Sequence, residues 1–137
     1  WNMKAERLEF PDDASRFEFT TIHFGAALGL AASIDEITNI GIQKVWEHDL
    51  ELTNMLIKGA LAIGLEIASP TNDRERSAIV SIQIPTGFNT GDVVQQLQEE
   101  YGILVTNRSG FLRVSPHIDN TTEQITFFLD SLQKILN

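Results

Sequence analysis

The sequence predicts an α/β (α+β) two-layer sandwich, in which a small, mostly antiparallel sheet of three to four strands is covered by helices. The chain has 137 residues, 42% hydrophobic and 21% charged, which is typical of one folded domain. Several segments repeat apolar residues at helical spacing, whereas residues 78–84 alternate as a strand does. A hairpin-like turn separates the last two predicted strands. We therefore expect a single domain over residues 1–137, with residues 1–19 as a lead-in segment.

The first predicted helix, residues 22–37, is apolar on all sides. A helix without a polar face is stable when it is buried all round, so we expect this one to face a partner surface that the sequence does not supply. Thr38 or Asn39 is the predicted N-cap of a second helix, which runs to about Ile63 and ends at Gly64.

The next segments combine a strand with a short helix. In residues 78–84 every second residue is apolar, which predicts a strand with one face on the core. Thr90 or Asp92 is the predicted cap of the helix that follows, and Gly102 is predicted to end it.

The last part of the sequence, from residue 103 onward, predicts a hairpin followed by a helix. Residues 103–106 and 111–115 are predicted strands, and residues 107–110 form the turn between them. Asn120 or Thr121 caps the final helix, with a capping-box pattern after it. The predicted inner face of this helix consists of six apolar residues: Ile125, Phe128, Leu129, Leu132, Ile135 and Leu136.

Composition and charge exclude several classes of function. The sequence has no cysteine, which excludes disulfides, cysteine-ligated metals and a cysteine nucleophile within these residues. Its formal net charge of −9 repels phosphate, so we expect no nucleic-acid or membrane partner. The apolar stretch 22–34 is shorter than the roughly 20 residues that cross a bilayer. With no signal-peptide pattern, the predicted location is cytoplasmic.

Few histidines or lysines are candidates for chemistry. His48 is flanked by acidic residues and is predicted to lie on a solvated helix face, and His117 is predicted to be a surface residue in a loop. There are no paired histidines at metal spacing and no phosphate-binding glycine loop. No lysine has the setting of a Schiff base. We therefore predict no metal site and no complete active site in this chain.

Residues 105–117 are the exception. If Leu112 and Val114 face the core, Arg113 projects from the opposite face of its strand, and Arg108 stands on the turn before it. Guanidinium groups bind carboxylates and phosphates in a bidentate manner, so both arginines are candidate anion-binding residues. On spacing alone, a surface ion pair between Arg113 and one of the nineteen acidic residues is the favoured interpretation.

Two motifs carry a family resemblance. Residues 16–21 read RFEFTT and precede an Ala/Gly/Leu-rich helix, and residues 112–125 read LRVSPHIDNTTEQI. The first resembles the Arg-Phe/Tyr-Glu-x-Gly-Thr segment of class V aminotransferases. The second is similar to their C-terminal signature, in which an Arg-x-Ser strand leads into Asn-Thr-x-x-Glu. These are pyridoxal-phosphate enzymes of fold type I, among them cysteine desulfurases and isopenicillin-N-epimerase-like proteins.

The resemblance implies the C-terminal small domain of a homodimeric, pyridoxal-phosphate-dependent enzyme that acts on an amino acid. Arg113 matches the arginine that binds the substrate's α-carboxylate, and Arg108 falls near a second basic position of the active site. Thr21 matches the threonine that helps to hold the cofactor phosphate, often in the neighbouring subunit's site. Thr20 stands beside it in place of the usual glycine.

Departures from the family pattern limit what the resemblance implies. The loop between Val105 and Arg113 has no cysteine, so an aminotransferase-, epimerase- or lyase-like activity fits better than desulfuration. The family's cofactor lysine belongs to a larger upstream domain, so we expect a fragment that is inactive alone. The alternative is a stand-alone, non-catalytic module of the same fold. It would bind a small carboxylate through Arg108 and Arg113 or dimerise through residues 22–37.

Overall fold

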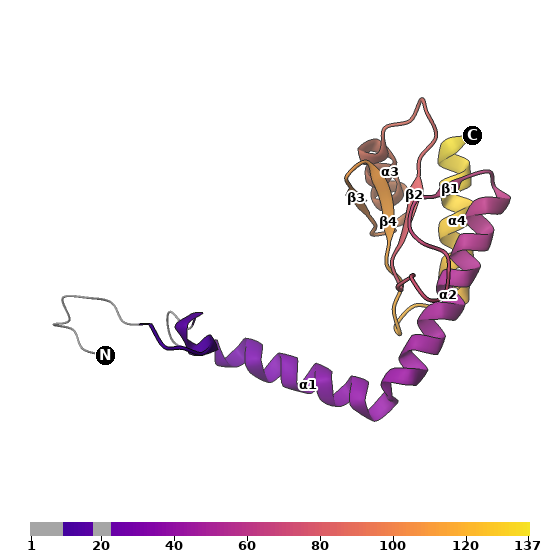
Figure 1. The fold of residues 1–137 in the computed structure, drawn as a ribbon. Coiled ribbons are helices and arrows are strands. Elements are labelled where there is room, and N and C mark those ends of the chain that lie inside the picture. Colours follow the sequence, from indigo (N-terminus) through magenta and orange to yellow (C-terminus); the bar gives the residue numbers. More distant parts are fainter. Residues whose placement is uncertain (1–9, 18–22) are drawn as a thin grey trace. The chain divides into compact units, whose positions relative to one another are not determined.

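The computed structural model describes residues 10–17 and 23–137, and Thr20 and Thr21 lie outside this part of the chain (Figure 1). The chain forms two compact units, residues 1–39 and 40–137. The four helices and the strands at residues 80–83, 106–108 and 111–114 follow one another in the order predicted above.

The first unit contains a 3-10 helix η1 (Ala14–Phe17) and most of helix α1 (Phe24–Ile40). Both the backbone amide and the hydroxyl of Ser15 donate to a carboxylate oxygen of Asp13, and these bonds lower the pKa of Asp13. None of the residues of α1 is buried. The expectation that a partner surface covers this apolar helix stays a prediction.

Helix α2 (Ile42–Ala62) has a glycine, Gly41, as its N-cap. The predicted caps Thr38 and Asn39 are wrong, because both residues lie in the last turn of α1. The two helices are instead separated by Gly41, whose φ of 96° is readily adopted only by glycine. The predicted C-terminal end is confirmed: Ile63 is the C-cap, and Gly64 follows it with φ 83°.

The sheet has four strands in the order β1-β2-β4-β3, and all pairs are antiparallel. The strands are β1 (Glu66–Ile67), β2 (Val80–Gln83), β3 (Thr106–Arg108) and β4 (Phe111–Val114). The alternation predicted for residues 78–84 is confirmed, because Val80, Ile82 and Ile84 are buried.

The hairpin is tighter than predicted. Residues 103–105 lie outside the ladder and β3 starts only at Thr106, which pairs with Arg113. Just beyond β4 the chain reaches Pro116, which has no amide proton for a longer ladder. The turn is reduced to Ser109 and Gly110, both of which have positive φ, as a two-residue hairpin turn requires.

The two remaining helices are α3 (Thr90–Tyr101) and α4 (Thr122–Leu136). The cap of α3 is Asn89 rather than the predicted Thr90 or Asp92, because its side chain accepts from two backbone amides of the first turn. The predicted stop at Gly102 is confirmed, with φ 68°. The predicted cap Thr121 is also confirmed, and Gln124 completes its capping box.

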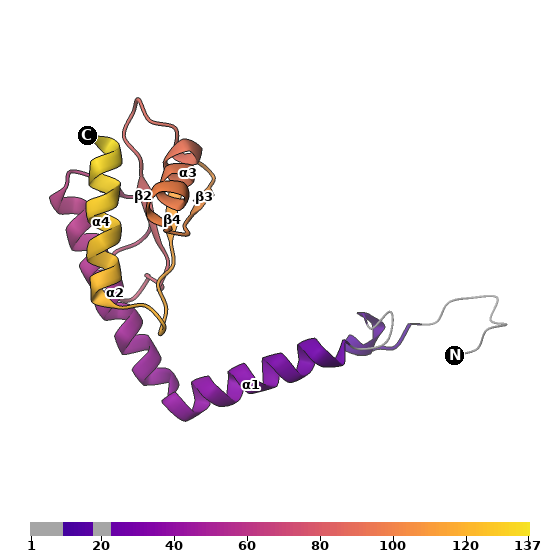
Figure 2. The same cartoon turned by 180° about the vertical axis from the view of Figure 1, so that it is seen from behind.

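The core lies between one face of the sheet and three helices. Helix α4, in yellow, runs beside α2 in both views, and α3 lies over β3 and β4 (Figures 1 and 2). Helices α2, α3 and α4 and strands β2 and β4 contribute to a single buried cluster, which includes Leu52, Leu56, Val80, Ile82, Val93, Leu97, Leu112, Ile125, Phe128 and Leu132. The predicted α/β fold with a small antiparallel sheet is therefore confirmed.

Candidate functional site

Arg113 lies on the face of the sheet that is turned away from the core. Its neighbours along β4, Leu112 and Val114, are 0% and 6% exposed, so strand alternation sends Arg113 to the opposite face as predicted. In the ladder Arg113 pairs with Ser81 of β2 and Thr106 of β3.

Arg108 lies on the same face. It pairs with Phe111, two residues before Arg113 on β4, and it follows Thr106 by two residues on β3. Residues two apart along a strand share a face. Arg108 and Arg113 are therefore diagonal cross-strand neighbours, a relationship whose Cα atoms are separated by about 7–8 Å. The hairpin thus brings together the two arginines that the sequence singles out.

Neither arginine is paired with an acidic side chain within the described part of the chain. The ion pairs there join Arg76 to Asp73 and His117 to Asp49. The surface ion pair that spacing favours for Arg113 is thus not formed among residues 10–17 and 23–137. Moreover, the Nε atom of Arg113 is buried without a hydrogen-bond partner there. A buried donor of this kind costs about 1–3 kcal/mol until a partner reaches it.

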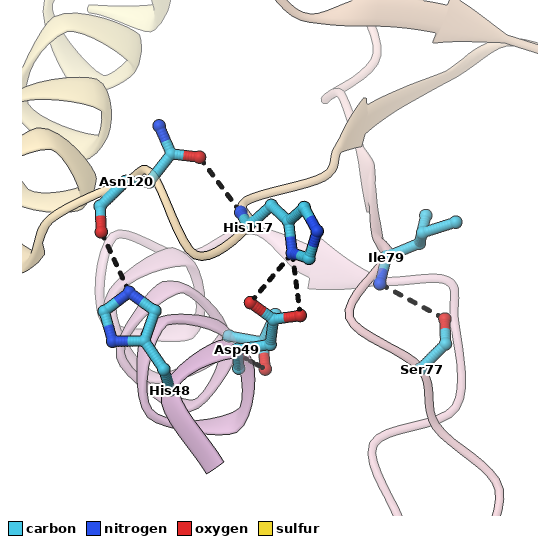
Figure 3. A network of polar contacts seen from close by, with 7 residues as sticks. His48, Asp49, Ser77, Ile79, His117 and Asn120 are labelled. Atoms are coloured by element: carbon cyan, nitrogen blue, oxygen red, sulfur yellow. Dashed lines mark hydrogen bonds and ion pairs between the residues drawn. The ribbon is translucent and has the colours of Figure 1, made fainter. Parts of the chain in front are cut away.

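A polar network lies where the loop after β4 meets helix α2 (Figure 3). The Nδ1 atom of His117 is 3.2 Å and 3.4 Å from the two carboxylate oxygens of Asp49. Asp49 is only 5% exposed, whereas about half of the His117 side chain is accessible. The Nε2 atom of His48 lies 2.9 Å from the carbonyl oxygen of Asn120.

Asn120 links this network to helix α4. Its side-chain oxygen accepts from the amide of His117 at 3.0 Å, and its side-chain nitrogen donates to Gln124 at 3.0 Å. The loop that follows the strand of Arg113 is thereby attached to two helices. Sequence reasoning missed Asp49 entirely. His48 does not lie on a solvated face as predicted, because it is half-buried against this loop, whereas His117 is at the surface as predicted.

The described lysines offer no site for a cofactor. Lys44, Lys58 and Lys134 are all exposed on helices, so none of them has the buried setting of a Schiff-base lysine. Within the described ranges, no three His, Asp or Glu side chains gather where they could hold a metal ion. The groove between α2 and α4 is lined by residues of these helices and contains neither Arg108 nor Arg113.

Comparison with solved structures identifies the fold. An apo cysteine desulfurase from Thermococcus onnurineus is similar to 93% of this chain with a TM-score of 0.81 and 25% identity, and the match covers 35% of that structure. An alanine–glyoxylate aminotransferase from Nostoc has a TM-score of 0.71 at 18% identity over 91% of this chain and 34% of its own, which shows the fold alone.

Sequence comparison identifies the family. The family described as aminotransferase class-V matches residues 2–128, and the chain therefore belongs to it. A protein named probable cysteine desulfurase from Chlamydia trachomatis is 31% identical over 96% of this chain and 35% of its own length. One of the same name from Pyrococcus abyssi is 28% identical over 88% of this chain and 33% of its own.

The chain spans about a third of the length of the curated relatives that it matches. Among the described residues, no helix combines the length and the apolar character needed to cross a membrane.

Proposed function

We propose that this chain is the C-terminal small domain of a pyridoxal-phosphate-dependent class V enzyme that acts on an amino acid. In this proposal Arg113 binds the substrate's α-carboxylate. One observation carries it: Arg113 lies on the sheet face turned away from the core, makes no ion pair with a described residue, and has a buried Nε without a partner there. A carboxylate would accept from this Nε and from a terminal nitrogen in a bidentate pair.

Arg113 would orient the substrate rather than react with it. Fixing the carboxylate at a rigid strand restricts the direction of the bonds at the substrate's Cα, which is an alignment effect. Pyridoxal phosphate, when bound in the complete enzyme, supplies the electron sink for the reaction. Because the described lysines are exposed on helices, we place the cofactor lysine in the part of the relatives that this chain does not span. The isolated chain should then be inactive.

Two parts of the proposal depend on the family alone. Thr21, with Thr20 beside it, would contact the cofactor phosphate, across the interface of a homodimer. The reaction would be a transamination, epimerisation or elimination. These 137 residues contain no cysteine that could carry a persulfide, although the relatives are named probable cysteine desulfurases.

The test uses the complete enzyme that contains this chain, with Arg113→Ala and Arg113→Lys. Both variants should lower kcat/KM for the amino-acid substrate, mainly through KM, by roughly 10- to 100-fold, because a charge-assisted hydrogen bond contributes about 1.5–3 kcal/mol. Lysine should rescue only part of this loss, since it lacks the planar fork. The absorbance of the bound cofactor should stay intact.

Arg74→Ala is the matched control, because Arg74 is an exposed arginine of the loop before β2. An unchanged KM in Arg113→Ala would remove Arg113 from substrate binding. A native protein of about the 15.3 kDa of this chain, detected with an antibody in its source cells, would contradict the enzyme and favour the stand-alone carboxylate-binding module.

A further inference from the structure

We infer that the substrate is an acidic amino acid, whose second anionic group is bound by Arg108 while Arg113 holds the α-carboxylate. This inference rests on the proposed function of Arg113. It starts from the register of the hairpin, which places Arg108 diagonally across from Arg113 on the sheet face turned away from the core. A substrate with one carboxylate would occupy only one of these two guanidinium groups.

The spacing of the two arginines suits a dicarboxylate. Diagonal cross-strand neighbours are separated by about 7–8 Å, within reach of long side chains. The two carboxylate carbons of aspartate or glutamate are joined by three or four carbon–carbon bonds, which spans about 4–5 Å. Guanidinium groups that start from diagonal positions on β3 and β4 can therefore contact both ends of such a molecule.

The backbone that carries Arg108 is held in place. The hydroxyl of Thr90 donates to the carbonyl oxygen of Gly110 at 2.8 Å, and the amide of Gly110 donates to the side chain of Asn107 at 3.2 Å. The first bond ties helix α3 to the hairpin turn, and the second joins the two residues that flank Arg108 and Ser109. Arg108 thus projects from a fixed point, which lowers the entropic cost of binding.

The electrostatics of this face favour a dianion. The chain carries a formal charge of −9, yet neither Arg108 nor Arg113 has an ion-pair partner among the described residues. Of the residues in the four strands, Glu66 is the acidic one, and it lies on β1 with β2 between it and Arg113. Two strand spacings amount to about 9–10 Å. A bound dianion would relieve the repulsion between the two arginines, whereas a neutral side chain would leave Arg108 unpaired.

The experiment compares isosteric substrates in the complete enzyme. We expect the wild type to prefer L-aspartate over L-asparagine, or L-glutamate over L-glutamine, in kcat/KM and in the dissociation constant obtained from changes in cofactor absorbance. Arg108→Ala and Arg108→Gln should lower kcat/KM for the acidic substrate about tenfold or more. The same variants should change the value for the neutral isostere by less than about twofold, so the preference should shrink or disappear.

Arg113→Ala should lower kcat/KM for both substrates, because both have an α-carboxylate. Arg74→Ala should change kcat/KM for neither. If Arg113→Ala lowers kcat/KM for both substrates but Arg108→Ala leaves the ratio of kcat/KM for the acidic and the neutral substrate unchanged, the inference fails and the proposed function stands. A wild-type preference for the neutral isosteres likewise overturns the inference and leaves the proposed function standing. If Arg113→Ala affects neither substrate, the proposed function itself fails.

Discussion

The Nδ1 atom of His117 lies 3.2 Å from a carboxylate oxygen of Asp49, a residue 68 positions away in the sequence (Figure 3). Asp49 is on α2 and almost fully buried, whereas His117 belongs to the loop between β4 and α4. A buried carboxylate is tolerated in a protein interior only with hydrogen-bond partners. The Asp49–His117 contact therefore connects the loop that follows Arg113 to the helical layer.

Removing either partner of this contact should destabilise the chain. Asp49→Ala and His117→Ala should each lower the free energy of unfolding by about 1–3 kcal/mol, because each change leaves the other group without this hydrogen bond. Urea denaturation of both single variants and of the double variant should give a loss smaller than the sum of the single losses. Glu51→Ala, an exposed acidic residue of the same helix, is the control and should change little.

If the losses of Asp49→Ala and His117→Ala add completely, the two side chains do not interact in solution. Hydrogen exchange in residues 115–121 provides a second measurement. It should become faster in both variants if the contact holds this loop in place.

The sequence predicts those features of the fold that depend on local chemistry. Gly102 ends α3 because its left-handed φ of 68° suits glycine, and Thr121 caps α4 because a threonine followed by a glutamine at the third helical position makes a capping box. The face of Arg113 is predictable because Leu112 and Val114 alternate with it. Each of these predictions uses residues within one or two turns of each other.

Features that depend on distant contacts or on competing local signals are not predictable in this way. Asn89 and Thr90 are both good helix caps, and only the hydrogen bonds of Asn89 decide between them. The ladder sets Arg108 beside Arg113, and its register depends on a two-residue turn shorter than the one predicted. Asp49 looks like one more acidic residue of a charged helix until His117 is folded against it.

Leu112 tests the core beneath the candidate site. It is fully buried between the sheet and the helices, so Leu112→Ala should lower the free energy of unfolding by about 2–5 kcal/mol through lost burial and a cavity. Leu104→Ala is the matched control, since Leu104 is 79% exposed and should lose less than about 0.5 kcal/mol. Equal urea midpoints for the two variants would contradict the core assignment.

Substitution of Gly102 measures the cost of backbone strain alone, without a contribution from packing. A Cβ atom added at this position meets no atom within 4 Å, so Gly102→Ala should destabilise only through its φ of 68°. The expected cost is about 1–2 kcal/mol. Gly102→Asn should cost less, because asparagine adopts the left-handed conformation more readily. Thermal unfolding of both variants measures the difference, and an alanine variant as stable as the asparagine variant would argue against this conformation.

We expect the stability of the chain to depend on pH through the carboxyl group of Glu123. A hydrogen bond from its own backbone amide, with a smaller one from Thr121, lowers the pKa of its carboxyl group in the first turn of α4. A carboxyl group whose pKa is lower in the folded state stabilises that state above its unfolded pKa, and this contribution is lost as the pH falls through the folded pKa. Glu123→Gln should therefore be less stable than the wild type at neutral pH, and the two stabilities should converge as the pH falls through the lowered pKa of the folded state. Urea midpoints over this range measure the difference, and a constant gap at every pH would mean that the charge of Glu123 is not its source.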